Sequence, residues 1–262
     1  MKILFIGDIV GAPGREAVKK LLPGLKKEHG LDFVIANAEN AAGGSGITGK
    51  VSEELFGAGV DVLTSGDHIW KKSEIFEIIN QENRILRPAN FPSGAPGCGW
   101  GIFKTANGVK VAVINLQGRV FMEPLESPFQ VVDKAQEELS KETKIILVDI
   151  HAEATSEKVA LGWFLDGKVS AVLGTHTHIQ TADEKILPSG TAYLTDAGMT
   201  GPYDSVIGRK VENVLEKFLT NVPLRFEVAE NDIQLHGAVI DIDEKTGKAR
   251  SIIRIQEKLD GK

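Results

Sequence analysis

Short apolar runs alternate with amphipathic segments of helical length through the first 80 residues, and each apolar run ends in polar residues. Strands separated by single helices form βαβ units, and such units build a mainly parallel sheet. The sequence therefore predicts an α/β fold for this part of the chain. The expected strands cover residues 2–6, 33–38 and 60–64, and the expected helices cover residues 14–29, 48–58 and 73–80.

The pattern changes beyond residue 88, where the strands are expected to pair in both directions. Asn107-Gly108 separates two apolar runs, at residues 101–105 and 109–115, and this dipeptide favours a β-hairpin. Residues 1–262 are expected to form one domain with two packed sheets. The remaining strands are predicted at 144–150, 170–173, 192–195, 224–228, 234–242 and 250–256, and the remaining helices at 129–140, 156–165 and 210–220.

Composition and charge exclude several classes of protein. With 42% hydrophobic and 25% charged residues the chain is ordinary for a globular protein, and a net charge of −6 argues against stable binding to nucleic acid or to an anionic membrane. The apolar run before Gly7 is too short for a signal peptide, and no run approaches the roughly 18 apolar residues of a membrane span. Cys98 is the only cysteine, which fits the cytoplasm and excludes a thiolate-rich metal site.

Polar residues of metal-ligand type follow five of the expected strands. A single Asp or His in such a place is usually a cap or a hydrogen-bonded structural residue, but the carboxyl ends of parallel strands meet at one edge of a sheet. Carboxylate, amide and imidazole ligands without thiolates suit a pair of Mn, Fe or Zn ions. The residues are Asp8, Glu39 with Asn40, Asp67 with His68, Asp149 with His151, and His176 with His178.

A glycine-rich segment offers a competing interpretation. Residues 44–50 match the first seven positions of a phosphate-binding P-loop, and the strand ending at Asp149 resembles its metal-binding partner strand. However, Val51 stands where a P-loop needs a Ser or Thr for magnesium. An NTPase site is therefore disfavoured.

Six segments of the chain together resemble the calcineurin-like metallophosphoesterase superfamily, and within it the YmdB-type branch of cyclic-nucleotide phosphodiesterases. The resemblance runs nearly from end to end and implies a four-layer αββα sandwich with a dimetal site at the carboxyl ends of the strands. The segments are GDIVG (7–11), NAENAAGG (37–44), NLQGR (115–119), HAEATSEK (151–158), GTHTH (174–178) and TDAGMTGP (195–202).

The resemblance also implies a role for each ligand. Asp8, Glu39, Asn40 and His178 would hold one metal ion, while Glu39 would bridge to a second ion held by Asp67, His151 and His176. Iron or manganese is the expected metal, with zinc or magnesium as alternatives. A hydroxide bridging the ions would attack phosphorus in line, and His68 would protonate the leaving alkoxide.

Two residues depart from the superfamily pattern. Val10 stands where the superfamily usually has a histidine, a difference that the YmdB-type branch shares, and Asn40 is expected to compensate. Asp67 stands where the family has the Asn of its Gly-Asn-His motif. An aspartate there still binds metal, but it places an additional negative charge beside an anionic substrate.

The expected activity is hydrolysis of small cyclic nucleotides, 2′,3′-cyclic and also 3′,5′-cyclic AMP. Two alternatives stay open: a phosphomonoesterase that uses the same dimetal site, and a metal-binding regulatory or scaffold protein with little catalysis. The family resemblance further implies a homo-oligomer. Arg15 and Arg119 are candidates either for contact with the substrate phosphate or for surface ion pairs.

Overall fold

The computed structural model describes residues 1–259 and places the strands in two mixed sheets that pack face to face. In the first sheet β13 (Ala249–Lys258) pairs with β12 (Ile233–Ile242) outside the main order of strands. The order in this sheet is β2 (Asp8–Ile9), β11 (Met199–Pro202), β12 (Ile233–Ile242), β1 (Lys2–Ile6), β3 (Phe33–Asn37) and β4 (Val62–Thr64). The order in the second sheet is β5 (Trp100–Lys104), β6 (Lys110–Gln117), β7 (Ile146–His151), β8 (Ala171–Thr175), β10 (Ala192–Leu194) and β9 (Lys185–Ile186).

Strand β1 shows how the sequence builds the layers. Its side chains alternate between the two faces of the sheet, as the period of two in a strand requires. Leu4 and Ile6 pack in the core shared with α1 (Gly11–His29), whereas Ile3 and Phe5 pack in the core between the two sheets. A strand that is buried on both faces needs a continuous apolar run, and this explains the composition of residues 3–6.

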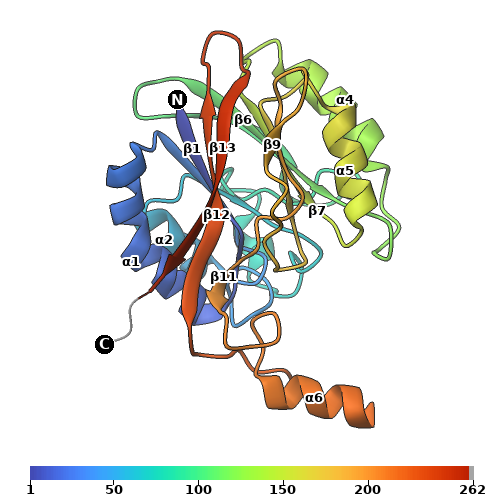
Figure 1. Ribbon diagram of the computed structural model, residues 1–262. Helices are drawn as coiled ribbons and strands as arrows, with labels where there is room; N and C mark the ends of the chain where they lie inside the picture. Colours follow the sequence, from blue (N-terminus) through green and yellow to red (C-terminus); the bar gives the residue numbers. More distant parts are fainter. Residues whose placement is uncertain (260–262) are drawn as a thin grey trace.

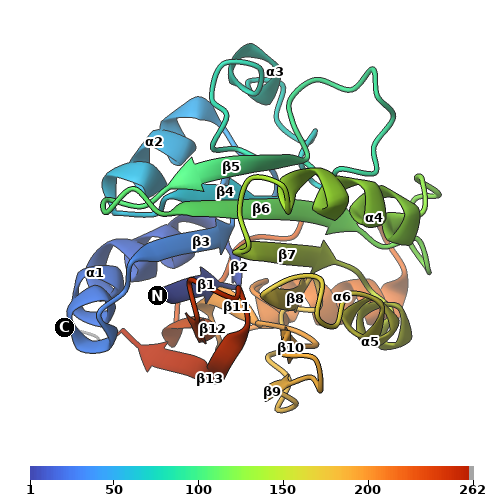
Figure 2. The same cartoon turned by 90° about the horizontal axis from the view of Figure 1, so that it is seen from above.

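Helices cover the outer face of each sheet, so the molecule has four layers. Helices α1 and α2 (Gly49–Gly57) lie on the first sheet, and α4 (Pro128–Leu139) and α5 (Thr155–Phe164) lie on the second (Figure 2). A third apolar core, which includes Val132 and Leu161, joins α4 and α5 to the second sheet. The αββα sandwich with two packed sheets is thus confirmed.

The register of the parallel strands determines where their ends meet. In the first sheet Asn37 of β3 pairs with Thr64 of β4, and in the second sheet His151 of β7 lies between Gln117 of β6 and Thr175 of β8. The segments that follow these strands therefore emerge at the same edge of their sheets. This edge carries the polar residues that the sequence singled out.

Three elements differ from the sequence-based expectation. The strand predicted at 224–228 is wrong: only Val228 forms a bridge, to Arg209, because Pro223 and the mostly exposed residues around it lie away from both sheets. The helix predicted at 73–80 is a single turn, α3 (Ile75–Ile78). The short strands β2, β9 and β11 were not predicted, since two to four residues carry no usable hydropathy period.

Helix α6 (Val211–Thr220) projects from the body of the molecule beyond the edge where the strands end (Figure 1). Val214 is its only buried residue. None of the helices within residues 1–259 has the length and apolar character needed to cross a membrane.

Candidate metal centre

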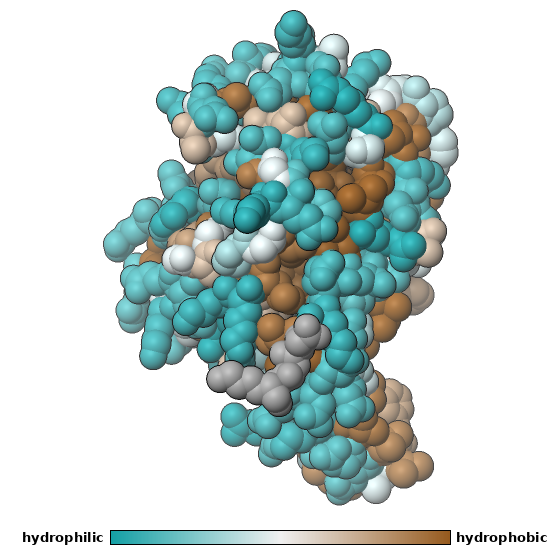
Figure 3. Space-filling view, turned by 60° about the vertical axis from the view of Figure 1, so that its left-hand side comes forward, coloured by the Kyte–Doolittle hydropathy of each residue, from teal (hydrophilic) through white to brown (hydrophobic). Residues whose placement is uncertain are grey.

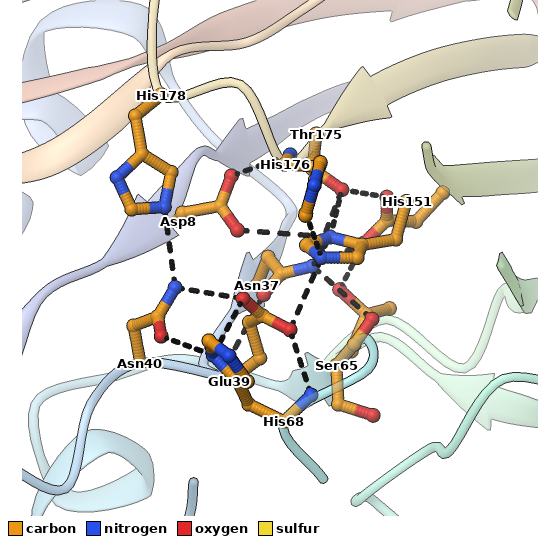
Figure 4. A network of polar contacts seen from close by, with 12 residues as sticks. Asp8, Asn37, Glu39, Asn40, Ser65, His68, His151, Thr175, His176 and His178 are labelled. Atoms are coloured by element: carbon orange, nitrogen blue, oxygen red, sulfur yellow. Dashed lines mark hydrogen bonds and ion pairs between the residues drawn. The ribbon is translucent and has the colours of Figure 1, made fainter. Parts of the chain in front are cut away.

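The predicted metal ligands and His68 come together where the strands end (Figure 4), and Asp67 lies among them, 3.2 Å from His151. Asp8 belongs to β2, Glu39 and Asn40 follow β3, and Asp67 and His68 follow β4. His151 closes β7, and His176 and His178 follow β8. Both sheets thus contribute side chains to one cluster, which we call the ligand cluster.

The ligand cluster contains two groups of atoms that are each compact enough to hold a metal ion. Within each group the candidate ligand atoms lie within 4.8 Å of one another. Glu39 belongs to both groups, so its carboxylate is placed to bridge two ions. The first group is Asp8, Glu39 and His178, and the second is Glu39, Asp67, His151 and His176.

Glycine is required at position 66, between β4 and the ligand Asp67. A Cβ atom on Gly66 would overlap the His151 ring and the Glu39 carboxylate. His151 Nε2 lies 3.1 Å from Glu39 Oε2 and 3.2 Å from Asp67 Oδ1. The close approach of the backbone to the cluster lets Asp67 and His151 converge on Glu39.

A buried hydrogen-bonded chain orients the His151 ring. Thr175 Oγ1 donates to Asp149 Oδ1 at 2.7 Å, so it accepts the proton of His151 Nδ1, which lies 2.9 Å away. Thr64 and Asn37 also donate to Asp149, at 2.5 Å and 3.0 Å. His151 Nε2 faces the Glu39 and Asp67 carboxylates, so this is the nitrogen that would bind a metal ion.

The other two histidines of the cluster are oriented in the same way. His178 Nδ1 donates to the carbonyl oxygen of Ile207 at 3.0 Å, and His176 Nε2 lies 3.2 Å from Glu153 Oε2. Of the remaining nitrogens, His176 Nδ1 lies 3.6 Å from Asp67 Oδ1, and one ring nitrogen of His178 lies within 4.8 Å of the Asp8 and Glu39 carboxylates. Each imidazole therefore has one nitrogen held by an outer acceptor and one available for a metal ion.

The electrostatics of the cluster favour a cation. Asp8 is fully buried, its Oδ1 atom has no hydrogen-bond partner, and burial raises its pKa to about 7. Burial lowers the pKa of the His151 ring, but the neighbouring Glu39, Asp67 and Asp8 carboxylates outweigh burial and raise it well above its usual value. Burial also lowers the pKa of His176 to about 4, so at pH 7 its imidazole is neutral and has a nitrogen lone pair for a metal ion. The donor set therefore fits metal ions, which would neutralise the carboxylates and occupy the unpaired Asp8 oxygen.

Asn40 joins the ligand cluster to His68. Its amide nitrogen donates to Glu39 Oε1 at 2.7 Å and lies 3.2 Å from His178 Nε2. Its amide oxygen lies 2.8 Å from His68 Nδ1, and that nitrogen also lies 3.4 Å from Glu39 Oε1. The hydrogen bond with Glu39 raises the pKa of His68. The His68 ring is thus held beside the cluster and is partly exposed to the pocket described below.

The turn that carries His176 and His178 has an unusual backbone and a buried ion pair behind it. The φ angles of the two histidines are 100° and 66°, in the region that residues with a Cβ atom rarely adopt. Asp196 accepts hydrogen bonds from the Thr177 amide at 3.1 Å and from the Thr177 hydroxyl at 2.8 Å. Lys158, fully buried, binds Asp196 at 2.7 Å and the Thr175 carbonyl oxygen at 2.9 Å. These contacts hold the turn in its strained form.

Sequence reasoning missed several of these supporting residues. Asn37 lay in a quoted segment and Asp149 was grouped with the residues of metal-ligand type, but nothing local showed that the two meet across the sheets and that Asp149 supports His151. Lys158 and Asp196 were also quoted, without a role. A signal did exist for Asp149, since it alternates with His151 along a strand and therefore shares its face.

The glycine-rich segment after Asn40 is a structural turn. Gly46 N donates to the carbonyl oxygen of Glu39 at 2.5 Å, which folds the chain back on that ligand. Thr48 caps the first turn of α2 by accepting a hydrogen bond from Val51 N at 3.3 Å. The segment thus positions Glu39, which accounts for its glycines without a P-loop.

A pocket of about 730 Å³ opens from the ligand cluster toward α6. Arg15 and Arg119 do not line it. Arg15 binds Glu54 at 2.8 Å and the Ala41 carbonyl oxygen at 2.7 Å, so its role is structural. The pocket is lined by Glu39, Asn40, His68, Glu153, His176, Thr177, His178, Val206, Ile207, Arg209, Val214, Lys217, Phe218, Asn221 and Phe226.

Comparison with known proteins agrees with this geometry. The chain is 54% identical over 255 residues to a Bacillus subtilis (strain 168) protein named 2′,3′-cyclic-nucleotide 2′-phosphodiesterase, with 97% of this chain and 96% of that protein covered. A crystal structure of a hypothetical protein from Thermus thermophilus matches with a TM-score of 0.92 at 41% identity, covering 98% of this chain and 99% of that one. A Mycoplasma pneumoniae crystal structure described as a novel phosphatase matches with a TM-score of 0.92 at 35% identity, covering 98% and 93%. The family model described as YmdB-like protein matches residues 4–255, and the chain belongs to that family.

Proposed function

We propose that the chain is a metal-dependent phosphodiesterase that hydrolyses 2′,3′-cyclic nucleotides. The observation that carries the proposal is the position of Glu39, which is shared by two groups of ligand atoms. A pair of metal ions so bridged is suited to phosphoryl displacement. The name of the Bacillus subtilis relative supports the substrate class.

The proposed ligands follow the two groups. Asp8, Glu39, Asn40 and His178 would hold one ion, and Glu39, Asp67, His151 and His176 would hold the other. Asn40 presents its amide nitrogen to the cluster, so it binds through oxygen only after its amide turns over. Oxygen and imidazole ligands without a thiolate favour iron or manganese, with zinc or magnesium as alternatives. When bound, the two ions supply a hydroxide nucleophile and withdraw charge from the phosphoryl oxygens.

His68 is the proposed proton donor. The hydrogen bond with Glu39 raises its pKa, so the protonated ring is available near neutral pH. Glu39 Oε1 lies 3.4 Å from His68 Nδ1, and the ring lines the pocket beside the ligand cluster. From that position His68 gives its proton to the alkoxide that leaves phosphorus when the cyclic diester opens.

Purified protein supplied with Mn²⁺ should hydrolyse 2′,3′-cyclic AMP, and the product should elute with 3′-AMP in chromatography. The His68→Ala variant should keep its metal ions and lose about 10²–10⁴-fold in kcat, the usual contribution of a general acid. If the protein hydrolysed no 2′,3′-cyclic AMP with iron, manganese, zinc or magnesium, the proposal would be contradicted. A test with 3′,5′-cyclic AMP measures how far the activity extends to larger rings.

A phosphomonoesterase is the second candidate, and the description of the Mycoplasma pneumoniae structure as a phosphatase favours it. Initial rates on 2′,3′-cyclic AMP and on 3′-AMP distinguish the two, because a monoesterase releases inorganic phosphate from the second substrate. A regulatory or scaffold role is tested with Glu39→Gln. That variant should lose catalysis, and a cellular effect that survives the substitution would favour scaffolding.

We also propose that residues 1–262 act as one domain in the cytoplasm and form a homo-oligomer. The site takes ligands from both sheets, which supports a single domain, although residues 260–262 lie outside the described part. The unpaired, exposed Cys98 fits a reducing compartment. An outer stripe, formed by Val211, Leu215 and Leu219 of α6 and by Val222 just after the helix, is 38–84% exposed and suits a contact with a second copy.

A further inference from the structure

One face of α6 lines the pocket that holds the ligand cluster. Val214, Lys217 and Phe218 line it, and their spacing of three and four residues places them on one side of the helix; Asn221, the residue that caps the helix, also lines the pocket. We call these four residues the pocket stripe. The pocket is therefore not closed by the two sheets alone, because a helix that projects from the body forms its far wall.

The chemistry of this wall differs from that of the ligand cluster. The side chains of Phe218, Phe226 and Ile207 line it and are 82%, 38% and 47% exposed. The Phe218 ring stacks on no other aromatic ring within residues 1–259. Figure 3 shows apolar side chains gathered over the projecting helix at the lower end of the molecule. An unstacked aromatic ring in a pocket wall offers a face on which a flat ligand can stack.

The wall is tied to the ligand cluster through its base. His178, a proposed ligand, donates from Nδ1 to the carbonyl oxygen of Ile207 at 3.0 Å. Arg209 donates to the carbonyl oxygen of Gly44, in the turn that follows Glu39 and Asn40. In addition, the backbone nitrogen of Lys210 donates to the carbonyl oxygen of Glu227 at 3.0 Å. This hydrogen bond joins the two ends of residues 210–227, which we call the α6 segment. The wall and the cluster are thus fixed relative to each other at one end of the pocket.

We propose that the pocket stripe, together with Ile207 and Phe226, is a nucleobase subsite that binds the base of the substrate while the ligand cluster binds its cyclic phosphate. This inference rests on the proposed function. A pocket of about 730 Å³ is large enough for a nucleotide, since small-molecule sites span about 300–1,000 Å³. The stripe also carries polar groups for the edge of a base: Lys217 Nζ donates a hydrogen bond to Asn221 Oδ1 at 3.1 Å, and the amide nitrogen of Asn221 is a further donor on the same wall.

The test compares Phe218→Ala with Leu219→Ala. Leu219 is the next residue of the same helix, is 84% exposed and does not line the pocket, so it is a matched control. Two substrates are used: 2′,3′-cyclic AMP and the 2′,3′-cyclic phosphate of methyl riboside, which has no base. Phe218→Ala should lower kcat/KM for cyclic AMP by about 10- to 100-fold through KM, and should leave the base-free substrate unchanged. Leu219→Ala should change neither value.

Three results would overturn the subsite. The first is an equal loss on both substrates in Phe218→Ala, the second is an equal loss in Leu219→Ala, and the third is a fall in molecular mass by light scattering in Phe218→Ala alone. The third result would assign the pocket stripe to an interface between copies of the chain. Titration of both variants with AMP and with ribose 5-phosphate separates this inference from the proposed function. If the wild-type protein hydrolyses neither substrate, the function fails, but weaker AMP binding by Phe218→Ala alone still supports the subsite.

Discussion

The ligand cluster and the α6 wall form opposite ends of one pocket and are built in opposite ways. Asp8, Glu39 and His151 are at most 1% exposed and come from strands of both sheets. The wall comes from one projecting helix, and Phe218 on it is 82% exposed. Several buried hydrogen bonds fix the orientation of each side chain in the cluster, whereas the wall is joined to the cluster through contacts near Ile207, before α6 begins. The difference separates a region that fixes reacting groups from a region that selects the ligand.

Removal of metal should produce the largest effect, and only at the cluster. After dialysis against a chelator, hydrolysis of 2′,3′-cyclic AMP should fall by about 10³-fold or more, because metal ions supply several kcal/mol of transition-state stabilisation. Added Mn²⁺ should restore the rate. Thermal unfolding should also shift, since ligand at 100 times its Kd adds about 2.7 kcal/mol to stability. Full activity of the chelated protein would contradict a metal-dependent cluster.

The buried pair behind the histidine turn should give the next largest effect. Asp196→Asn removes the charge that Lys158 binds and weakens the acceptor that holds Thr177. Metal affinity measured by calorimetry should fall by about 10–100-fold, as for other residues that orient metal ligands. Asp133→Asn is the matched control, because Asp133 forms an exposed pair with Lys168 at 2.9 Å and should change stability by less than about 1 kcal/mol. Unchanged metal affinity in Asp196→Asn would show that the turn holds its shape without the pair.

Asp67→Asn should have a smaller effect that leaves the metal content intact. The Oδ1 atom of Asp67 lies 3.2 Å from His151 Nε2, and an amide oxygen can replace it as a ligand. Loss of a negative charge beside an anionic substrate should raise kcat by about tenfold, equal to ~1.4 kcal/mol. Metal analysis and initial rates on both proteins check this. If only the variant is active, the regulatory interpretation gains support.

The outer stripe of α6 should matter least for catalysis. Leu219→Glu places a charge in the proposed contact between copies and should lower the molecular mass measured by light scattering. Because Leu219 does not line the pocket, kcat and KM should stay within about twofold, as expected for a surface substitution. A large fall in kcat would mean that a second copy completes the site.

The comparison also explains what the sequence could predict. Each ligand of the cluster directly follows or ends an apolar run, so the local pattern placed Asp8, Glu39 and His151 at one edge of the sheets. The residues that support the ligands are paired over long separations: Asn37 and Asp149 are 112 residues apart, and Lys158 and Asp196 are 38 apart. No local pattern encodes such contacts.

The α6 segment was the least predictable region. The sequence predicts a helix at 210–220 but does not single out an exposed apolar face on it, because an apolar face normally packs on the body of a protein. Here most of that face is exposed, and the pocket stripe and the outer stripe lie side by side on the helix. The strand predicted at 224–228 was wrong because these residues join neither sheet: Phe226 lines the pocket beside α6, and Val228 forms only an isolated bridge with Arg209.

The central claim is that Glu39 joins two metal ions into one catalytic site. We would measure metal content per chain by plasma mass spectrometry together with hydrolysis of 2′,3′-cyclic AMP, for the wild-type protein and for Glu39→Gln. The account predicts two ions and activity in the wild-type protein, and fewer than two ions with hydrolysis at least about 10³-fold slower in the variant. Two ions and undiminished hydrolysis in Glu39→Gln would contradict it.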